Sequence, residues 1–344
     1  MSPVSLAVLS AGPCVTVQDA GRPGYQRYGV AEGGALDRYA LAEGAALLQN
    51  DPASAAIECF GLGGRFQAKG GALRFALSGA PMAAYQMDAT GQKERLTWRA
   101  SGLLQEGEVL ELGAAEGGLV SYLHLGGGIA VMRELGARAT HLRAAIGPPR
   151  LEAGQSLSVG PDQSADKELR RKRLPEPDYL GKREIRILWG PQAERFSPAV
   201  RQRLLESDYR VSAKRDRMGA RLEGPSLEAE GQLTGLSDAV SLGDVQVPGD
   251  GLPLVLLADR QPTGGYPRIA TVISADLAAF AQLESGQPFR FRLVEEEEAL
   301  EALAAWRRKI AGLSKRITPL LRDPRELPDL LSYNLIDGVV TGGD

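Results

Sequence analysis

The chain has 344 residues, 43% of them hydrophobic and 24% charged, with a formal net charge of −3 at pH 7. This is the composition of a globular protein large enough for two domains. The slight acidity, with a pI near 5.7, argues against nucleic acid or an anionic membrane surface as a partner. No apolar run in the sequence is long enough to cross a bilayer.

Cysteine and histidine are scarce. Cys14 and Cys59 are too few and too far apart for a disulfide scaffold or a Cys-x-x-Cys site. This is typical of a reducing cytoplasm, where we expect the protein. With His124 and His141 as the only histidines, we expect no metal site in this chain and a structural role for both rings. Residues 1–11 lack the basic and long apolar regions of a signal peptide and are expected to form a first strand.

The first dense polar segment lies at residues 15–30. A short alternating strand runs into a Gly/Pro loop that carries Gln18, Asp19 and Arg22. Asp37 then has the place of an N-cap, because apolar residues at helical spacing follow it up to an Asn-Asp-Pro stop at 50–52.

Short strands dominate the next hundred residues. Gly-rich turns separate them at the spacing typical of sandwiches and barrels, so a closed or nearly closed β structure is expected. The predicted strands are 57–60, 73–77, 108–112 and 119–125. The glycines at 126–128 lack the strand-loop-helix context of a phosphate-binding loop.

A polar segment divides the chain. Lys, Arg, Glu, Asp and Pro crowd together there with little to bury, which indicates a linker. We therefore predict an N-terminal module at 1–165, a linker at 166–182, and a C-terminal module at 183–344.

The C-terminal module begins with a predicted strand at 185–189 and a helix that Ser197 and Pro198 open and that ends near Glu206. If 209–224 forms one strand, Arg215 and Arg217 share one face and Asp216 lies on the other. The alternative is that these three side chains form a row of solvent-exposed charges on the protein surface, with no functional role.

A second dense polar loop lies between the apolar runs 252–257 and 269–273. Rigid strands on both sides are typical of a loop that carries binding or catalytic groups. A tight turn in which its Asp and Arg pair with each other is the alternative. The polar and glycine residues of this loop are Asp259, Arg260, Gln261, Thr263, Gly264, Gly265 and Tyr266.

The last predicted elements are a helix from Ser274 to Leu283, a strand at 289–294 and a long helix at 295–313. The long helix is acidic at its start and basic at its end, as its macrodipole favours. Residues 330–340 are compatible with a further strand or with docking on a partner.

Three motifs resemble the KipA family, also called the allophanate hydrolase subunit 2 or biotin-dependent carboxyltransferase-like family. They are TVQDAGRPGY at 16–25, DRMGARLEG at 216–224 and LADRQPTGGYP at 257–267, and the resemblance runs in order from about residue 4 to residue 294. It implies a mainly β fold with several helices, built as two cyclophilin-like β-barrel modules.

The resemblance also implies partners and an activity. Members work beside a KipI-type subunit and, in ATP-dependent 5-oxoprolinase, a LamB/YcsF-type subunit, to open 5-oxo-L-proline to L-glutamate. We expect ATP, with Mg²⁺, at the level of the complex and no activity of the chain alone. One alternative is a carboxyltransferase component of a urea carboxylase or allophanate system. The other is a KipA-like regulator that binds a KipI-type kinase inhibitor.

Arginines and backbone N–H groups are suited to hold a carboxylate, a phosphate and a developing oxyanion, and carboxylates to orient water or move a proton. The catalytic candidates are Asp216, Arg217, Asp259 and Arg260. The substrate-binding candidates are Gln18, Asp19, Arg22, Gln261, Thr263, Gly264, Gly265 and Tyr266. No methionine is followed by lysine, so the chain lacks a biotinyl-lysine motif.

The sequence departs from the family pattern at three places. Many relatives have Gly-Ser-Arg-Ser-Thr where this chain has GARAT at 136–140, and a glycine-rich segment where it has GPPR at 147–150. Thr-Gly-Ala-Asp is common where it has SGAP at 78–81. The loss of two hydroxyls and a carboxylate is compatible with a changed substrate.

Overall fold

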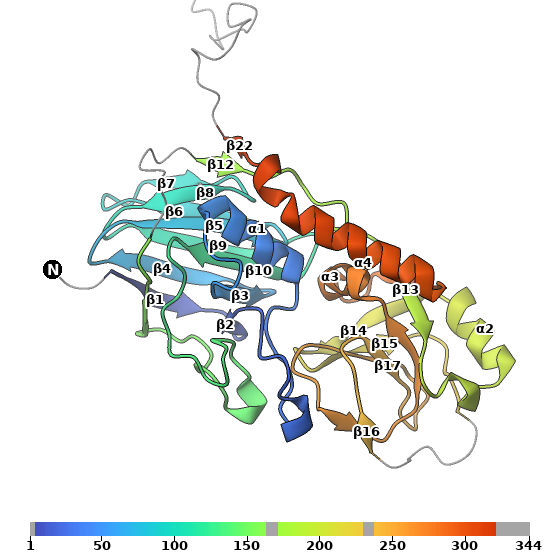
Figure 1. Ribbon diagram of the computed structural model, residues 1–344. Helices are drawn as coiled ribbons and strands as arrows, with labels where there is room; N and C mark the ends of the chain where they lie inside the picture. Colours follow the sequence, from blue (N-terminus) through green and yellow to red (C-terminus); the bar gives the residue numbers. More distant parts are fainter. Residues whose placement is uncertain (1–3, 163–170, 230–236, 321–344) are drawn as a thin grey trace, which may run out of the picture.

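The computed structural model describes residues 4–162, 171–229 and 237–320 (Figure 1). Strands form most of the regular structure and are arranged as two sheets in the N-terminal half and a closed barrel in the C-terminal half. The predicted mainly β class is therefore confirmed. None of the helices in the described ranges is both long and apolar enough to span a membrane.

The N-terminal half consists of two sheets around one shared core. Phe66 and Leu110 of the first sheet pack in the same cluster as Ile57 and Leu123 of the second. The first sheet contains, in order, β11 (Ser156–Ser158), β1 (Ser5–Ala11), β4 (Gly64–Lys69), β9 (Val109–Ala115), β6 (Met82–Met87) and β7 (Lys93–Arg95). The second contains β2 (Val15–Gln18), β3 (Ala56–Phe60), β10 (Val120–Leu125), β5 (Leu73–Gly79) and β8 (Ser101–Leu104).

The C-terminal half is a closed barrel with a buried core. Ile187, Val211, Val255 and Phe291 are buried in it from four different strands. The strands follow one another as β13 (Glu184–Trp189), β20 (Arg268–Val272), β17 (Asp244–Gln246), β18 (Leu254–Leu256), β15 (Gly219–Glu223), β14 (Tyr209–Arg215) and β21 (Pro288–Leu293).

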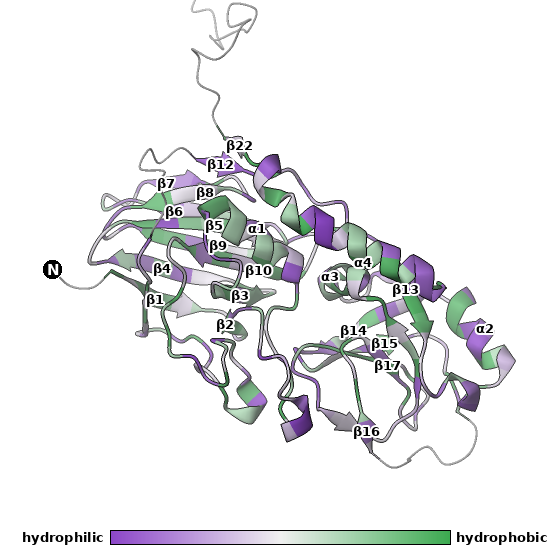
Figure 2. Cartoon of the chain, in the orientation of Figure 1, coloured by the Kyte–Doolittle hydropathy of each residue, from purple (hydrophilic) through white to green (hydrophobic). Residues whose placement is uncertain are grey.

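The expected helices are present. They are α1 (Arg38–Leu48), α2 (Pro198–Glu206), α3 (Leu277–Gln282) after a 3-10 turn at Ser274–Asp276, and α4 (Glu296–Ala311). The predicted caps hold, because the Asp37 carboxylate accepts a hydrogen bond from the Ala40 N–H at 2.9 Å and the Ser197 hydroxyl caps α2. Hydrophobic and hydrophilic residues alternate along α4 (Figure 2).

One predicted strand is wrong. Residues 209–224 form a hairpin of β14 and β15, and the turn falls at Asp216–Met218. The Asp216 carboxylate closes that turn by accepting hydrogen bonds from Met218 N–H at 2.7 Å and Gly219 N–H at 3.2 Å. Arg215 and Arg217 therefore do not share one strand face.

The two halves are joined by shared packing. Leu41 of α1 belongs to the same buried cluster as Phe280 of α3 and the barrel residues. Trp306 of α4 packs against the cluster that contains Tyr39, so α4 lies along both halves (Figure 1). Of the predicted linker, the described residues include β12 (Lys172–Arg173), which pairs with β22 (Thr318–Pro319). The domain boundaries stay a prediction, and residues 330–340 lie outside the described ranges.

Candidate functional site

The three motif loops meet at one place between the halves. The Gly33 N–H donates to the Ala258 carbonyl at 3.1 Å, and the Asp259 N–H donates to the Arg217 carbonyl at 2.8 Å. The loop after β2, the β14–β15 turn and the loop after β18 are thus hydrogen-bonded to one another. Some of the site candidates are buried near this meeting point, and others line an open pocket.

Arg217 is the centre of the buried group. It is 7% exposed, and its guanidinium donates to both carboxylate oxygens of Asp259, at 2.9 and 3.0 Å, and to the Gly34 carbonyl at 2.7 Å. It also forms an ion pair with Glu58. Burial alone would lower the pKa of Arg217, but the Glu58 and Asp259 carboxylates raise it above its usual value. Arg217 therefore stays charged in the interior.

Glu58 belongs to this group although it lies outside the three sequence motifs. It is fully buried in β3, where its carboxylate accepts hydrogen bonds from the Leu36 N–H at 3.0 Å and the Tyr122 hydroxyl at 2.6 Å. The signal was a carboxylate in the middle of the apolar strand Ile57–Phe60, since a buried carboxylate requires a partner. Through Glu58, Arg217 of the barrel is tied to the N-terminal sheets.

Arg22 lies beside this pair. It is 1% exposed, and its Nη2 donates to the Ala139 carbonyl. Its Nε and Nη1 have no hydrogen-bond partner within the described parts of the chain. Burial lowers the pKa of Arg22, an effect that the carboxylates of Asp19 and Asp259 oppose. A Cβ on Gly33 would lie 2.9 Å from Nη1, so the guanidinium needs glycine there.

Gln18 and Asp19 hold the loops that surround Arg22. The Gln18 amide donates to Thr16 Oγ1 and to the Thr140 carbonyl, both at 3.0 Å. The Asp19 carboxylate accepts from the Gly21 N–H at 2.8 Å and the Arg138 N–H at 2.6 Å. Both residues join the loop after β2 to the segment at 138–140.

Arg260 does not pair with Asp259, so the predicted alternative of an Asp–Arg turn pair is wrong. Its side chain is 5% exposed, and its hydrogen bonds to described residues are long, to the Val240 carbonyl at 3.3 Å and Gln26 Oε1 at 3.4 Å. It lines a separate cavity of about 350 Å³ together with Trp306 of α4. Adjacent residues of one loop therefore face different spaces.

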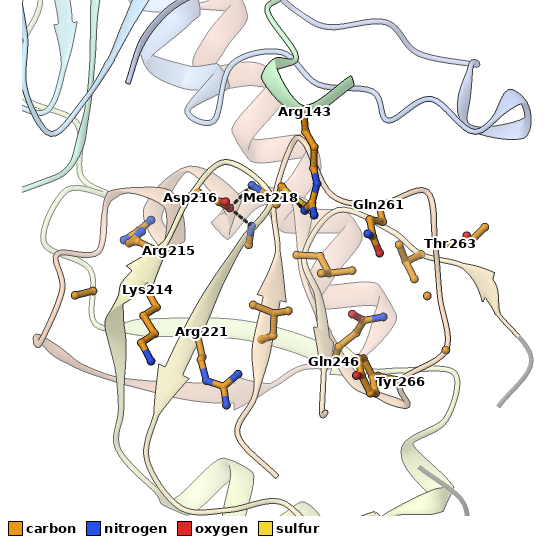
Figure 3. A pocket seen from close by; sticks show the side chains of 17 residues that line it. Arg143, Lys214, Arg215, Asp216, Met218, Arg221, Gln246, Gln261, Thr263 and Tyr266 are labelled. Carbon is orange, nitrogen blue, oxygen red and sulfur yellow. Dashed lines mark hydrogen bonds between the residues drawn. The ribbon is translucent and has the colours of Figure 1, made fainter. Parts of the chain in front are cut away.

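The remaining candidates line an open pocket of about 690 Å³ at one side of the barrel (Figure 3). Asp216 lies in the β14–β15 turn, and the other candidates come from the segment between β18 and β20, which contains the short strand β19 (Thr263–Gly264). The sequence candidates in this pocket are Asp216, Gln261, Thr263, Gly264, Gly265 and Tyr266. Arg143 of the N-terminal half reaches the pocket as well, where its Nη1 contacts the Met218 sulfur at 2.7 Å.

The pocket has a positive lining. Arg143, Lys214, Arg215 and Arg221 border it, against the single carboxylate of Asp216. Arg215 is anchored by the Leu283 carbonyl at 2.5 Å and the Ala281 carbonyl at 3.1 Å, and burial lowers its pKa to about 10. Such a lining suits an anionic ligand.

None of these four cations was a predicted site residue. Lys214 and Arg221 lie on strands, where alternation alone does not say which face is the lining, and Arg143 comes from a distant segment. Lys214 is exposed, and the described residues offer its ammonium group no hydrogen bond or ion pair. It is therefore available to a ligand.

Neither histidine lies in the pocket lining. The His124 ring is buried 3.2 Å from the Ser78 hydroxyl, and the His141 Nδ1 accepts a hydrogen bond from the Ala144 N–H at 3.2 Å. In the described ranges, no three His, Cys, Asp or Glu side chains are grouped so as to hold a metal ion.

Several known proteins resemble this chain over most of its length. Residues 28–293 match the family model of the carboxyltransferase domain, subdomain A and B. Two similar proteins are named as C subunits of 5-oxoprolinase. The one from Haemophilus influenzae is 34% identical over 85% of this chain and 92% of its own length. The one from Escherichia coli is 35% identical over 91% of this chain and 98% of its own length.

A solved structure gives the same fold. The urea amidolyase of K. lactis has a TM-score of 0.82 at 23% identity, over 94% of this chain and 21% of that chain. This chain thus spans about a fifth of that protein. The chain belongs to the carboxyltransferase family of subdomains A and B, together with the C subunits of 5-oxoprolinase.

Proposed function

We propose that the chain is a subunit of an ATP-dependent 5-oxoprolinase, which opens 5-oxo-L-proline to L-glutamate with KipI-type and LamB/YcsF-type subunits. The observation that carries the proposal is the end-to-end match to two relatives that are named as C subunits of this enzyme. The positive pocket at the barrel supports it, because the substrate carries a carboxylate.

The chemistry explains why such a site needs cations and several subunits. A five-membered lactam is a poor electrophile, so transfer of a phosphoryl group from ATP to the lactam carbonyl oxygen prepares the carbonyl carbon for attack by water. The C–N bond then breaks, the nitrogen takes a proton and phosphate leaves. Negative charge grows on oxygen during these steps, and arginine, lysine and backbone N–H groups stabilise it. We assign the substrate carboxylate to the cations of the pocket lining, among them Arg143 and Lys214.

The glycine turn that the sequence offered for a phosphate has no room for one in the described structure. The turn at Gly126 and Gly127 is filled, since a Cβ on either residue would meet Asp162 or the Gly160 carbonyl at 2.4 Å or less. No carboxylate cluster for the metal is present in the same ranges. We therefore assign ATP to the complex and derive no step from it on this chain.

The test is glutamate release from 5-oxoproline and ATP by the chain mixed with its genomic KipI-type and LamB/YcsF-type neighbours. We expect glutamate only when all three proteins are present, and none from the purified chain alone. A complete mixture that assembles without releasing glutamate would contradict the proposal. Full activity of the chain alone would contradict the need for partners.

A second candidate function is a carboxyltransferase component of a urea carboxylase system, which the description of the matched family favours. Because no Met-Lys pair is present in the sequence, biotin would have to arrive on another chain. An assembled complex that consumes ATP in the presence of urea and a biotinylated carrier, but not of 5-oxoproline, would favour this function. Sequestration of a KipI-type inhibitor without any turnover would favour the KipA-like regulator.

A further inference from the structure

Gln246 is a buried pocket residue whose amide nitrogen is unpaired in the described structure. It lies at the end of β17, its side chain projects into the barrel pocket beside Tyr266 (Figure 3), and it is only 5% exposed. Its Nε2 has no hydrogen-bond partner among the residues that the structure describes. The backbone pairs with β18 and β20, so only the side chain is left unsatisfied.

The surroundings of Gln246 keep its amide in place. A Cβ on Gly264 would lie 2.5 Å from Nε2 and 3.3 Å from a methyl group of Val240. Because glycine has no Cβ, residue 264 leaves room for the Gln246 amide. An unpaired buried amide destabilises a fold, and an apolar side chain of the same size would fill the site without this loss. Such a group is expected where a ligand completes its hydrogen bonds.

A glutamine amide is matched in hydrogen bonding by a cis amide. It offers a carbonyl oxygen and an N–H on one edge, and a cis amide offers an N–H and a carbonyl oxygen on one edge, so the two form a pair of hydrogen bonds. Peptide bonds are almost always trans and do not offer that edge. A five-membered lactam ring is held cis and always offers it.

We propose that the Gln246 amide binds the lactam edge of the substrate in the barrel pocket. The carboxylate of the same ligand is held by cations of the pocket lining, where Lys214 has a free ammonium group in the described structure and Arg143 contacts the Met218 sulfur. The ligand class is a small cyclic amide that carries a carboxylate. This inference rests on the proposed function, and it names the part of the chain that recognises the substrate ring.

Calorimetric titration of the full chain in its assembled complex, without ATP, tests this site. The probes are 5-oxoproline and cyclopentanecarboxylate, which has the ring and the carboxylate without the amide. We expect the wild type to bind 5-oxoproline, and Gln246→Leu to weaken that binding about 10- to 100-fold, as expected for the loss of two neutral hydrogen bonds. Cyclopentanecarboxylate is expected to bind weakly and equally to both proteins.

Two further variants sharpen the test. Gly264→Ala places a methyl group against Nε2, so it is expected to weaken 5-oxoproline binding in the same direction. Gln202→Leu changes an exposed glutamine on α2, whose amide donates to Glu206 at 2.7 Å, and is expected to bind like the wild type. Gln246→Leu is expected to unfold at the same or a higher urea concentration than the wild type, because it removes an unpaired amide.

Three results would overturn the inference. They are wild-type affinity of Gln246→Leu for 5-oxoproline, no binding of 5-oxoproline to the wild type, and a marked loss of stability in Gln246→Leu, which would assign the residue a structural role. Glutamate release by the wild-type complex tests the proposed function separately. If the wild-type complex releases glutamate but Gln246→Leu binds 5-oxoproline as well as the wild type does, only the proposed binding site is rejected. If 5-oxoproline binding depends on Gln246 but no glutamate is released, only the proposed reaction is rejected.

Discussion

Arg217 and Asp259 form a bidentate ion pair inside the protein, with Nε 2.9 Å from one carboxylate oxygen and Nη2 3.0 Å from the other. Both side chains are less than one tenth exposed. The pair joins the β14–β15 turn to the loop after β18, and the Glu58 ion pair extends it to the N-terminal sheets. The two halves of the chain are therefore held together by one buried charge network.

Asp259→Ala is predicted to weaken both the fold and the enzyme. Arg217 would keep Glu58 but lose its bidentate partner, and breaking a buried pair in this way destabilises a protein by about 3–5 kcal/mol. Because Glu58 remains, we expect a loss of about 3 kcal/mol in the free energy of unfolding, measured by urea denaturation. In a reconstituted complex, under conditions in which the variant is folded, we expect assembly with the partners but no turnover.

Asp250→Ala is the matched control for that variant. Asp250 is half exposed and pairs with Arg221 at the surface, so its removal should change the free energy of unfolding by less than about 1 kcal/mol. Wild-type turnover of Asp259→Ala would remove Asp259 from the site. Wild-type stability would show that the buried Arg217–Asp259 pair does not stabilise the barrel half.

Arg22 and Arg217 are both buried, but we predict opposite effects on stability when each becomes methionine. Arg217 is bound by two carboxylates, so Arg217→Met leaves uncompensated charge and should cost about 3–5 kcal/mol. Arg22 has two nitrogens without a partner in the described structure, and burial lowers its pKa. Arg22→Met should therefore leave the free energy of unfolding unchanged or raise it by about 1 kcal/mol.

Urea denaturation and turnover of the two variants separate a functional arginine from a structural one. We expect Arg22→Met to fold as well as the wild type and to lose turnover in the reconstituted complex. A large loss of stability in Arg22→Met would mean that the unpaired nitrogens have partners in the folded protein. Retained turnover would place Arg22 outside the site.

Local patterns in the sequence were sufficient for most of the elements. Asp37 before an apolar stripe predicted α1, and Ser197-Pro198 predicted α2, because capping depends on a few neighbouring residues. The hairpin turn at Asp216 was not predicted. A run without Pro or Asn-Gly reads as one strand, and only the Asx-type closure by the Asp216 side chain reveals the turn.

The geometry of the site depends on contacts that the sequence does not encode locally. The three motifs lie on loops that meet in the fold, and nine of their residues line one pocket. The partner of Asp259, however, is Arg217 rather than its neighbour Arg260, because successive loop residues face different spaces. Gln246 lies outside the motifs, in a short barrel strand, and its importance appears only once its amide is seen to be unpaired.

Acid should destabilise the protein partly through His124. Burial lowers the pKa of its imidazole from 6.5 to about 3, so the unfolded chain binds a proton near pH 6.5 and the folded chain only near pH 3. Stability from this group is therefore fully present above about pH 6.5 and is lost as the pH falls toward 3. At pH 4.5 the loss is about 2–3 kcal/mol, since one pKa unit is worth about 1.4 kcal/mol.

The contribution of His124 is measured as the difference between two proteins in how steeply the free energy of unfolding changes with pH. Free energies of unfolding of the wild type and His124→Gln are compared between pH 7 and pH 4.5, because carboxylates titrate in both proteins and cancel. The wild type should lose more stability than the variant over this range. If the free energies of unfolding of the two proteins change with pH in parallel, the His124 ring is not buried in its neutral form. An NMR titration in which the ring of the folded protein takes up a proton near pH 6 would contradict the prediction as well.

Gly44 of α1 should not tolerate even a methyl group. A Cβ at this position would lie 2.0 Å from the His124 ring, and the ring is enclosed by the helix and the Ser78 hydroxyl. Alanine normally stabilises a helix relative to glycine by up to about 1 kcal/mol, whereas overpacking costs about 1–3 kcal/mol or more. We predict that Gly44→Ala lowers the free energy of unfolding by at least about 2 kcal/mol.

Gly312→Ala at the end of α4 provides the control, because its Cβ would approach nothing closer than 3.3 Å and its φ is −87°. Its free energy of unfolding should stay within about 1 kcal/mol of the wild type. If the His124 ring is the cause, Gly44→Ala should cost much less in a His124→Ala background, where the ring is absent. If Gly44→Ala costs the same in both backgrounds, the two substitutions act independently. The His124 ring would then not be the cause of the loss.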